Sequence, residues 1–143
     1  MKISLLICFY SLFIGWHNNL DEAKKIATQE HKYILLNFSG SDWCGPCIRM
    51  HKEIFDDSDF SKMADSELVM VNADFPRMKK NQLSKEQQKL NDDMADHYNA
   101  RGAFPYTVLL NADGKVLKEW DGFPNESAYE FADEVKNVID SNK

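Results

Sequence analysis

The residues best suited to chemistry are two cysteines three positions apart, in the run Trp43-Cys44-Gly45-Pro46-Cys47. A thiol attacks a disulfide only as the thiolate, so a reactive cysteine needs a stabilised anion and an accessible sulfur. A helix that begins at Cys44 would favour the anion by about 0.3–1 kcal/mol, through its unpaired N–H groups and its dipole. Because one pKa unit is worth about 1.4 kcal/mol, even this interaction raises the thiolate fraction near neutral pH.

The spacing gives the two sulfurs different roles. We predict that Cys44 is the nucleophile, and that Cys47, one helical turn later, attacks the mixed disulfide and releases the partner. Pro46 falls where a helix loses no backbone donor, Gly45 lets a partner backbone come close, and Trp43 offers a flat apolar surface. We expect these three residues to contact the substrate.

A lone cysteine pair is also half of a zinc site. Zinc takes four ligands in such sites, and the nearest other candidates are His51 and His97, with no second cysteine pair. We therefore expect no metal and no cofactor, and we expect His51 to be half-exposed or part of the core. The third cysteine, Cys8, lies in a separate segment and is predicted to be a small buried hydrophobe.

The elements around the motif can be read from apolar spacing. Residues 33–38 form a short apolar run, which predicts a strand buried on both faces. After Cys47, residues at helical spacing predict a helix that begins at the motif and ends near residues 56–58. Functional sites in α/β sheets lie beyond the carboxyl ends of strands, and the predicted strand leads straight into the cysteines.

The remaining elements complete an α/β layer arrangement. Capping-box patterns at 19–22 and 84–87 predict two helices, one running to about residue 30 and one carrying the stripe Leu90, Met94 and Tyr98. Further strands are predicted at 68–74 and 104–110, a turn at 111–114, an antiparallel return at 116–120, and a last amphipathic helix at 131–139. We interpret the basic stretch after Pro76 as a solvated connection.

Composition and charge set the class of protein. The chain has 143 residues, 43% of them hydrophobic and 28% charged, which suits one soluble domain. The formal net charge of −6 argues against nucleic acid as a partner. We expect a monomer whose mature domain does not insert stably in a membrane.

The N-terminal segment has two interpretations. Met1-Lys2 is followed by a mostly apolar run at 3–14, which is short for a membrane span of roughly 20 residues and suits the hydrophobic region of a secretory signal. This predicts a signal peptide at 1–15 and a domain at 16–143. The alternative is that the run is a first, buried strand.

The run Trp43-Cys44-Gly45-Pro46-Cys47 after a buried strand resembles the active-site sequence of thioredoxins, and the resemblance covers about residues 20–139. It implies an α/β thioredoxin-like fold, with a central mixed β-sheet flanked by helices on both faces. Residues 37–44 and 74–77 look most like exported bacterial thioredoxin-like proteins of the disulfide reductase and isomerase type.

The resemblance also implies a substrate-binding strand. Pro105 would be a cis-proline facing the cysteines, and the backbone of Phe104 would pair with an extended substrate peptide as an added strand. The alternative is an ordinary trans-proline at a strand entrance. Ala103 and Phe104 separate Gly102 from Pro105, where thioredoxins usually have one residue.

A second departure concerns proton transfer. Thioredoxins carry a buried aspartate under the active site and a lysine on the neighbouring strand, and this chain has Asn37 and Met70 at the matching positions. A neutral amide cannot accept the proton that leaves Cys47, so water, or Asp42 if it turns inward, would serve. We expect slow resolution at neutral pH and faster resolution after Asn37→Asp.

Together these features predict a periplasmic or otherwise extracytoplasmic thiol-disulfide oxidoreductase that reduces or isomerises protein disulfides. The Gly-Pro dipeptide between the cysteines resembles the reducing members, and an exported enzyme needs an electron donor such as a membrane-bound disulfide reductase. One alternative is a cytosolic thioredoxin recycled by a flavin-dependent reductase. Another is a peptide-binding or chaperone module without turnover. The Cys47→Ala variant would distinguish the two, because an enzyme would trap covalent partners through Cys44 and a binding module would behave unchanged.

Overall fold

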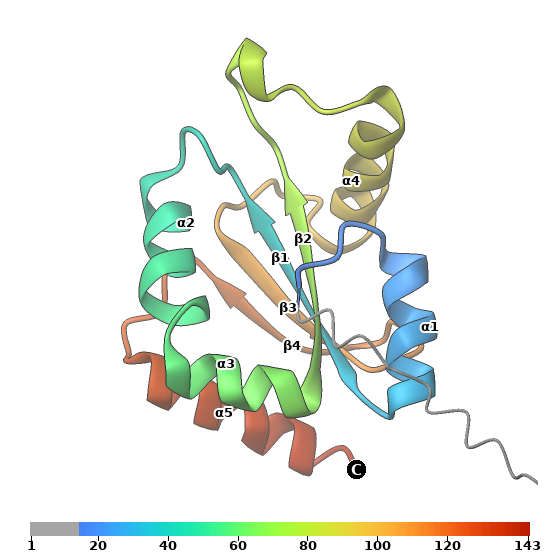
Figure 1. Ribbon diagram of the computed structural model, residues 1–143, viewed down its shortest axis with the longest axis vertical. Coiled ribbons are helices and arrows are strands. Elements are labelled where there is room, and N and C mark those ends of the chain that lie inside the picture. The colour runs from blue at the N-terminus through green and yellow to red at the C-terminus, as the bar shows by residue number, and fades with distance from the viewer. Residues whose placement is uncertain (1–14) are drawn as a thin grey trace, which may run out of the picture.

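A four-stranded mixed sheet forms the centre of the structure, a computed structural model that describes residues 15–143 (Figure 1). The strand order is β2-β1-β3-β4, where β1 is parallel to β2 and antiparallel to β3, and β3 is antiparallel to β4. The predicted α/β class and thioredoxin-like fold are confirmed. The bounds of the strands are Tyr33–Ser39 (β1), Leu68–Asp74 (β2), Tyr106–Leu110 (β3) and Val116–Asp121 (β4).

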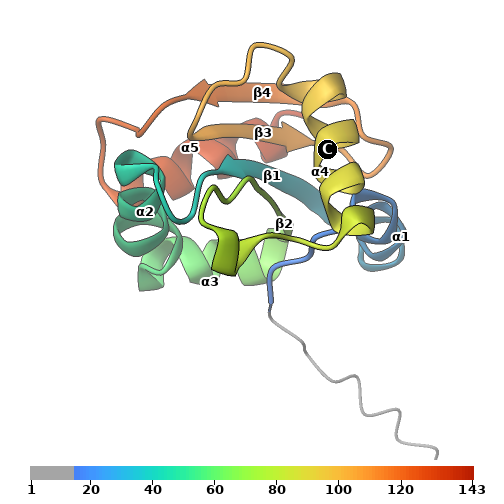
Figure 2. The ribbon, with the colours of Figure 1, turned by 90° about the horizontal axis from the view of Figure 1, so that it is seen from above.

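Helices cover both faces of this sheet, as the sequence predicted (Figure 2). One core cluster joins α3 and α5 to the sheet, and the other joins α1 and α4 to the opposite face. Alternate residues of β1 enter the two clusters, since Leu35 packs in the first and Leu36 in the second. The helices of these two layers are Leu20–Glu30 (α1), Ser58–Glu67 (α3), Lys85–Tyr98 (α4) and Ala128–Asp140 (α5).

The helix that begins at the cysteine motif has two parts. α2 spans Gly45–Met50 and continues directly as a π-helical turn, η1, over His51–Phe55. The predicted end near 56–58 agrees with this boundary. Cys47 and Met50 are buried from α2, and Ile54 and Phe55 from η1, so this segment lies against the same sheet face as α3 and α5.

The sequence reading missed α3 entirely. Its N-cap is Asp57, whose side chain accepts the N–H of Asp59, and its buried residues are Phe60 and Ala64, four positions apart. Two buried residues in a helix of ten give a weak apolar period, so the segment carries little helical signal in its sequence.

The predicted capping boxes form only in part. Asn19 and Ser84 each accept the N–H three residues later. Gln87 does not return a bond to its cap and instead donates to the carbonyl of Asn18 and to Asn91. A reciprocal box occurs at Ser127, which exchanges bonds with Glu130 at the start of α5.

His17 lies at the edge of β2. His17 forms an isolated parallel bridge with Val71, in which its N–H donates to the carbonyl of Met70 and its carbonyl accepts from the N–H of Asn72. The two interpretations of residues 1–14, signal peptide or strand, lie outside the described residues, as does Cys8. Within residues 15–143, no helix is both long and apolar enough to cross a membrane.

Candidate active site

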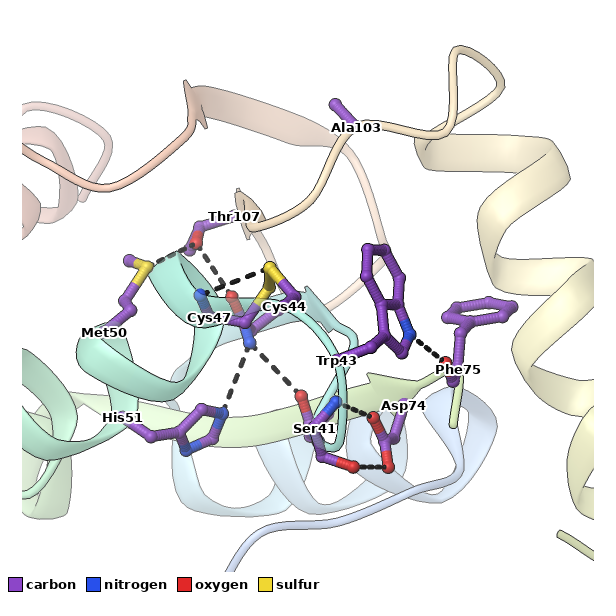
Figure 3. The surroundings of a disulfide bond; sticks show 12 residues. Ser41, Trp43, Cys44, Cys47, Met50, His51, Asp74, Phe75, Ala103 and Thr107 are labelled. Atoms are coloured by element: carbon purple, nitrogen blue, oxygen red, sulfur yellow. Dashed lines mark hydrogen bonds between the residues drawn. A yellow bond between two sulfur atoms is a disulfide. The ribbon is translucent and has the colours of Figure 1, made fainter. Parts of the chain in front are cut away.

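Cys44 and Cys47 are joined by a disulfide at the N-terminus of α2, with their Cα atoms 5.2 Å apart (Figure 3). Cys44 keeps 5% of its surface exposed, and Cys47 is fully buried. Gly45 and Pro46 between them are exposed. Of the two sulfurs, that of Cys44 is therefore the one a partner can reach first.

Cys44 is itself the N-cap of α2. Its Sγ accepts the N–H of Cys47 at 3.3 Å, while its carbonyl accepts the N–H of Ile48 at 3.1 Å. Pro46 occupies the first turn, where no backbone donor is lost, as predicted. When the disulfide is reduced, the same N–H and the helix dipole favour a thiolate at Cys44 over a thiol, because hydrogen bonds to the charged form lower a pKa.

The loop before Cys44 is tied to the end of β2. The backbone N–H and hydroxyl of Ser41 both donate to the carboxylate of Asp74, at 2.9 and 2.5 Å. The indole N–H of Trp43 donates to the carbonyl of Phe75 at 2.8 Å. Gly40 is required here, because a Cβ at this position would lie 2.3 Å from the Trp43 ring. These contacts fix the direction from which the chain enters α2.

Asp42 points away from the cysteines. Its carboxylate accepts the N–H groups of Arg77 and Met78, both at 2.9 Å, and the side-chain amide of Asn81 at 3.0 Å. The Arg77 and Asn81 bonds lower the pKa of Asp42 below its usual value. The alternative that Asp42 turns inward to take the proton of Cys47 is therefore wrong. We call Asp42 and Asp74 the outer carboxylates.

Aromatic rings form a rim beside the cysteines. The Phe104 ring packs edge-on against both Trp43 and Phe75, with centroids 5.5 Å apart in each case. The guanidinium of Arg77 lies 3.6 Å from the Trp43 ring centroid. The predicted solvated connection after Pro76 is thus exposed but anchored, by Asp42 and by this stacking.

The Phe104–Pro105 peptide bond is cis, as the resemblance implied. Pro105 is buried at the start of β3, and its carbonyl accepts the N–H of Gly122 at 2.9 Å. The structure thus brings Trp43 and Phe104 into contact, and it holds Gly45 and Pro46 exposed in the turn between the two cysteines.

A second group of polar side chains lies beneath the motif, and we call Asn37, His51, Asn72 and Thr107 the inner polar cluster. The hydroxyl of Thr107 donates to Oδ1 of Asn37 at 3.1 Å. Nδ2 of Asn37 donates to Oδ1 of Asn72 at 3.2 Å and lies 3.5 Å from Nε2 of His51. In Figure 3 this chain of hydrogen bonds runs from Thr107 to His51.

The register of the sheet explains the cluster. Asn37 is paired with Asn72 on β2 and with Thr107 on β3, so the three side chains share the face on which α2 lies. Asn37 and Thr107 are fully buried. Met70, which stands where the resemblance puts the lysine of thioredoxins, pairs with Leu35, two residues before Asn37.

His51 closes the cluster from the helix side. It follows Cys47 by four residues and is half-buried, with its ring centroid 5.0 Å from that of Trp16 and 5.3 Å from that of Phe55. Burial lowers the pKa of His51, against an opposing effect of the Asp56 and Asp74 carboxylates. The expectation of a half-exposed or core histidine is confirmed. What sequence reasoning missed is its contact with Asn37.

The possible zinc ligands besides the two cysteines were His51 and His97. His51 belongs to η1, which packs on the same face of the sheet as α3 and α5. His97 is an exposed residue of α4, which packs on the opposite face. Within residues 15–143, no three His, Cys, Asp or Glu side chains are grouped so that they could hold a metal ion.

Known proteins resemble this chain over nearly all of the described residues. A family model described as a thioredoxin-like domain matches residues 20–139. A Chlamydia pneumoniae protein named disulfide bond reductase DsbH is 37% identical over 118 residues, which are 82% of this chain and 69% of that protein. Thioredoxin-related protein DsbJ of the same organism is 26% identical over 128 residues, and the match spans 36% of its length.

A solved structure gives the same result in three dimensions. A structure titled DsbH oxidoreductase superposes with a TM-score of 0.79 at 31% identity, and the match covers 98% of this chain and 94% of that one. The likeness thus extends from sequence to backbone arrangement.

Proposed function

Because the chain belongs to the thioredoxin-like family, we propose that it is a thiol-disulfide oxidoreductase that reduces or isomerises protein disulfides outside the cytoplasm. The observation that carries the proposal is the Cys44–Cys47 pair at the start of α2, where the more accessible sulfur also accepts a helix N–H. A similar protein is named a disulfide bond reductase, which supports the reducing direction.

The reaction runs in two exchanges. The Cys44 thiolate attacks one sulfur of a substrate disulfide, so the other substrate sulfur leaves as a thiolate and a mixed disulfide forms. The Cys47 thiolate then attacks Sγ of Cys44, which releases the second substrate sulfur and yields the Cys44–Cys47 disulfide. Two electrons pass from the enzyme to the substrate, and an electron donor must restore the dithiol.

We assign substrate contact to the surface around Cys44. Trp43 and Phe104 offer apolar rings on the rim, and the exposed Gly45 and Pro46 let a chain approach the sulfur. The backbone before Pro105 would pair with an extended peptide as an added strand. An extended, partly unfolded segment around the substrate disulfide fits this surface best.

The proposed compartment and electron donor rest on the apolar run at 3–14. A signal peptide at 1–15 would deliver a monomeric domain, 16–143, to the extracytoplasmic space, where a membrane-bound disulfide reductase would supply electrons. Fractionation of cells that express the full chain, with N-terminal sequencing of the product, tests this. Recovery from the cytosol with residues 1–15 intact would favour the cytosolic alternative.

The enzymatic proposal is tested with Cys47→Ala. A protein substrate with a disulfide should become covalently trapped on Cys44, because the resolving thiol is missing, while the unaltered chain turns over and reduces insulin with dithiothreitol. The double variant Cys44→Ser, Cys47→Ala is the control and should trap nothing. A peptide-binding module without turnover would bind equally in all three forms, and that result would reject the enzyme.

A further inference from the structure

The resolving step needs a proton acceptor that the two cysteines do not provide. Cys47 is fully buried, and an unperturbed thiol has a pKa of about 8.5, so at neutral pH it must lose a proton before it can attack. Burial in apolar surroundings raises a thiol pKa further. A base close to Cys47 would therefore speed this step.

The nearby carboxylates are committed elsewhere. Asp42 is bonded to the backbone of Arg77 and Met78. Asp74 is bonded through both of its oxygens to Ser41. Both therefore hold loops on the outer side of the site, whereas Cys47 faces the core.

His51 is the titratable side chain on the inner side. It lies one turn after Cys47, and helical residues four apart have Cβ atoms about 5–6 Å from each other. Its Nε2 faces the amide of Asn37 at 3.5 Å. Because Thr107 occupies Oδ1 of Asn37, the amide presents its N–H groups to His51, and Nε2 therefore carries a lone pair on the buried side.

We propose that His51 accepts the proton of Cys47 during the resolving step, through one water or directly, and that this makes it a further functional residue. The inference rests on the proposed oxidoreductase function. It assigns a chemical role to a residue outside the cysteine motif.

The step balances as follows. The S–H bond of Cys47 breaks and its proton passes to Nε2 of His51, which becomes an imidazolium. The thiolate electron pair forms the bond to Sγ of Cys44, and the bond from Cys44 to the substrate sulfur breaks. The substrate sulfur leaves with that electron pair. His51 gives its proton either to that sulfur or to solvent, so the imidazole is neutral again.

The inner polar cluster can follow this change of charge. Once Nε2 carries a proton it becomes a donor, and rotation of the Asn37 amide turns Oδ1 toward it. Nδ2 of Asn37 then faces Thr107, whose hydroxyl accepts as well as donates. Asn72 can rotate in the same way, so both protonation states keep their hydrogen bonds.

The environment keeps the base available. Burial lowers the pKa of His51, so the ring is neutral at pH 7, while Asp56 at the end of η1 and Asp74 at the end of β2 oppose this effect. The other neighbours are uncharged: Trp16, Phe55 and the amide of Asn37. The rate of resolution should fall as pH drops through this lowered pKa, because an imidazolium accepts no proton.

The test isolates the resolving step. Cys44 is first converted to a mixed disulfide with 5-thio-2-nitrobenzoate, and release of the coloured thiolate by Cys47 is followed by stopped flow from pH 5 to 10. At pH 7 we expect His51→Gln to slow release by about 10- to 100-fold, within the usual range for general-base catalysis. The gap should narrow toward the upper end of this pH range, as Cys47 begins to ionise without help.

Matched variants separate the chemistry from packing. His97→Gln, an exposed change on α4, should behave as the unaltered chain does. His51→Phe keeps a ring against Trp16 and Phe55 and should be as slow as His51→Gln. Asn37→Asp should accelerate release far more in the His51→Gln chain than alone, because it supplies a base in the same cluster. Equal rates of Cys44 alkylation would show that the start of α2 is intact.

Two results would overturn the inference. One is a His51→Gln profile that matches the unaltered chain at every pH. The other is an unaltered chain whose rate shows no inflection below about pH 6.5, the ordinary pKa of histidine, and this result needs no variant to fold. If the unaltered chain released no thiolate at any pH, the oxidoreductase proposal itself would fail, which distinguishes the two.

Discussion

The outer and inner sides of the active site use opposite kinds of polar group. On the outside, the carboxylates of Asp42 and Asp74 accept hydrogen bonds from two loops. On the inside, beneath Cys47, the cluster consists of two amides, a hydroxyl and an imidazole. An ionised carboxylate is costly to bury without a charged partner, so it suits the edge that water reaches. Charge therefore holds the loops in place on the outside, whereas the inner polar cluster beneath the motif is made of neutral groups.

The largest effect is expected when a carboxylate is placed in the inner polar cluster. Asn37→Asp should lower the free energy of unfolding by about 3 kcal/mol near pH 8, because burial raises a carboxyl pKa, here by about two units at 1.4 kcal/mol each. A folded-state pKa above the unfolded value means that stability is retained below about pH 4 and lost as pH rises through the folded pKa. Urea unfolding across this range measures it.

Asn72→Asp is the matched control for that prediction. Asn72 lies in the same cluster but is only partly buried, so Asn72→Asp should lower the free energy of unfolding at pH 8 by less. If Asn37→Asp lowered stability equally at pH 4 and pH 8, the cost would come from packing, and the contrast between the two sides would lose its electrostatic basis.

A smaller loss is expected from Gly40→Ala on the outer side. The new methyl group would lie 2.3 Å from the Trp43 ring, which is held by its bond to Phe75. Overpacking of this kind costs about 1–3 kcal/mol, and displacement of the indole should change its fluorescence. Gly45→Ala is the control for stability, since a Cβ there meets nothing within 4 Å. Equal unfolding free energies for the two variants would show that the ring moves aside freely.

The smallest effect is expected from Asp42→Asn, because the carboxylate is exposed to solvent. The lowered pKa of Asp42 means that its bonds contribute stability above the unfolded value near 3.8, and that this contribution is lost as pH falls through the folded value. At neutral pH the N–H groups of Arg77 and Met78 should exchange with solvent faster in the variant, and the difference should shrink in acid. Asp96→Asn, exposed on α4, should leave their exchange unchanged.

Much of the fold could be predicted because its signals are local. The apolar run that forms β1, the alternation in β2 and the stripe of α4 each lie within one short window of sequence. The cysteine pair and its helix position were predictable for the same reason. α3 was missed because few of its residues are buried, so the local signal was weak.

The inner polar cluster could not be predicted, since it depends on register between strands. Asn37, Asn72 and Thr107 are far apart in sequence, and only the pairing of β1 with β2 and β3 brings them to one point. A shift of one residue would turn Asn72 to the other face of the sheet. The direction of Asp42 was equally inaccessible, because it depends on how the loop after β2 folds back.

The bridge between His17 and Val71 covers part of the outer edge of β2. His17 satisfies backbone groups of Met70 and Asn72 that would otherwise face solvent at the sheet margin. An unprotected margin of this kind invites pairing with other chains. A protease that cuts before Trp16 would leave this cover in place, whereas a cut only a few residues later would remove it and promote self-association. The folded domain therefore limits where the signal peptide proposed at 1–15 could be removed.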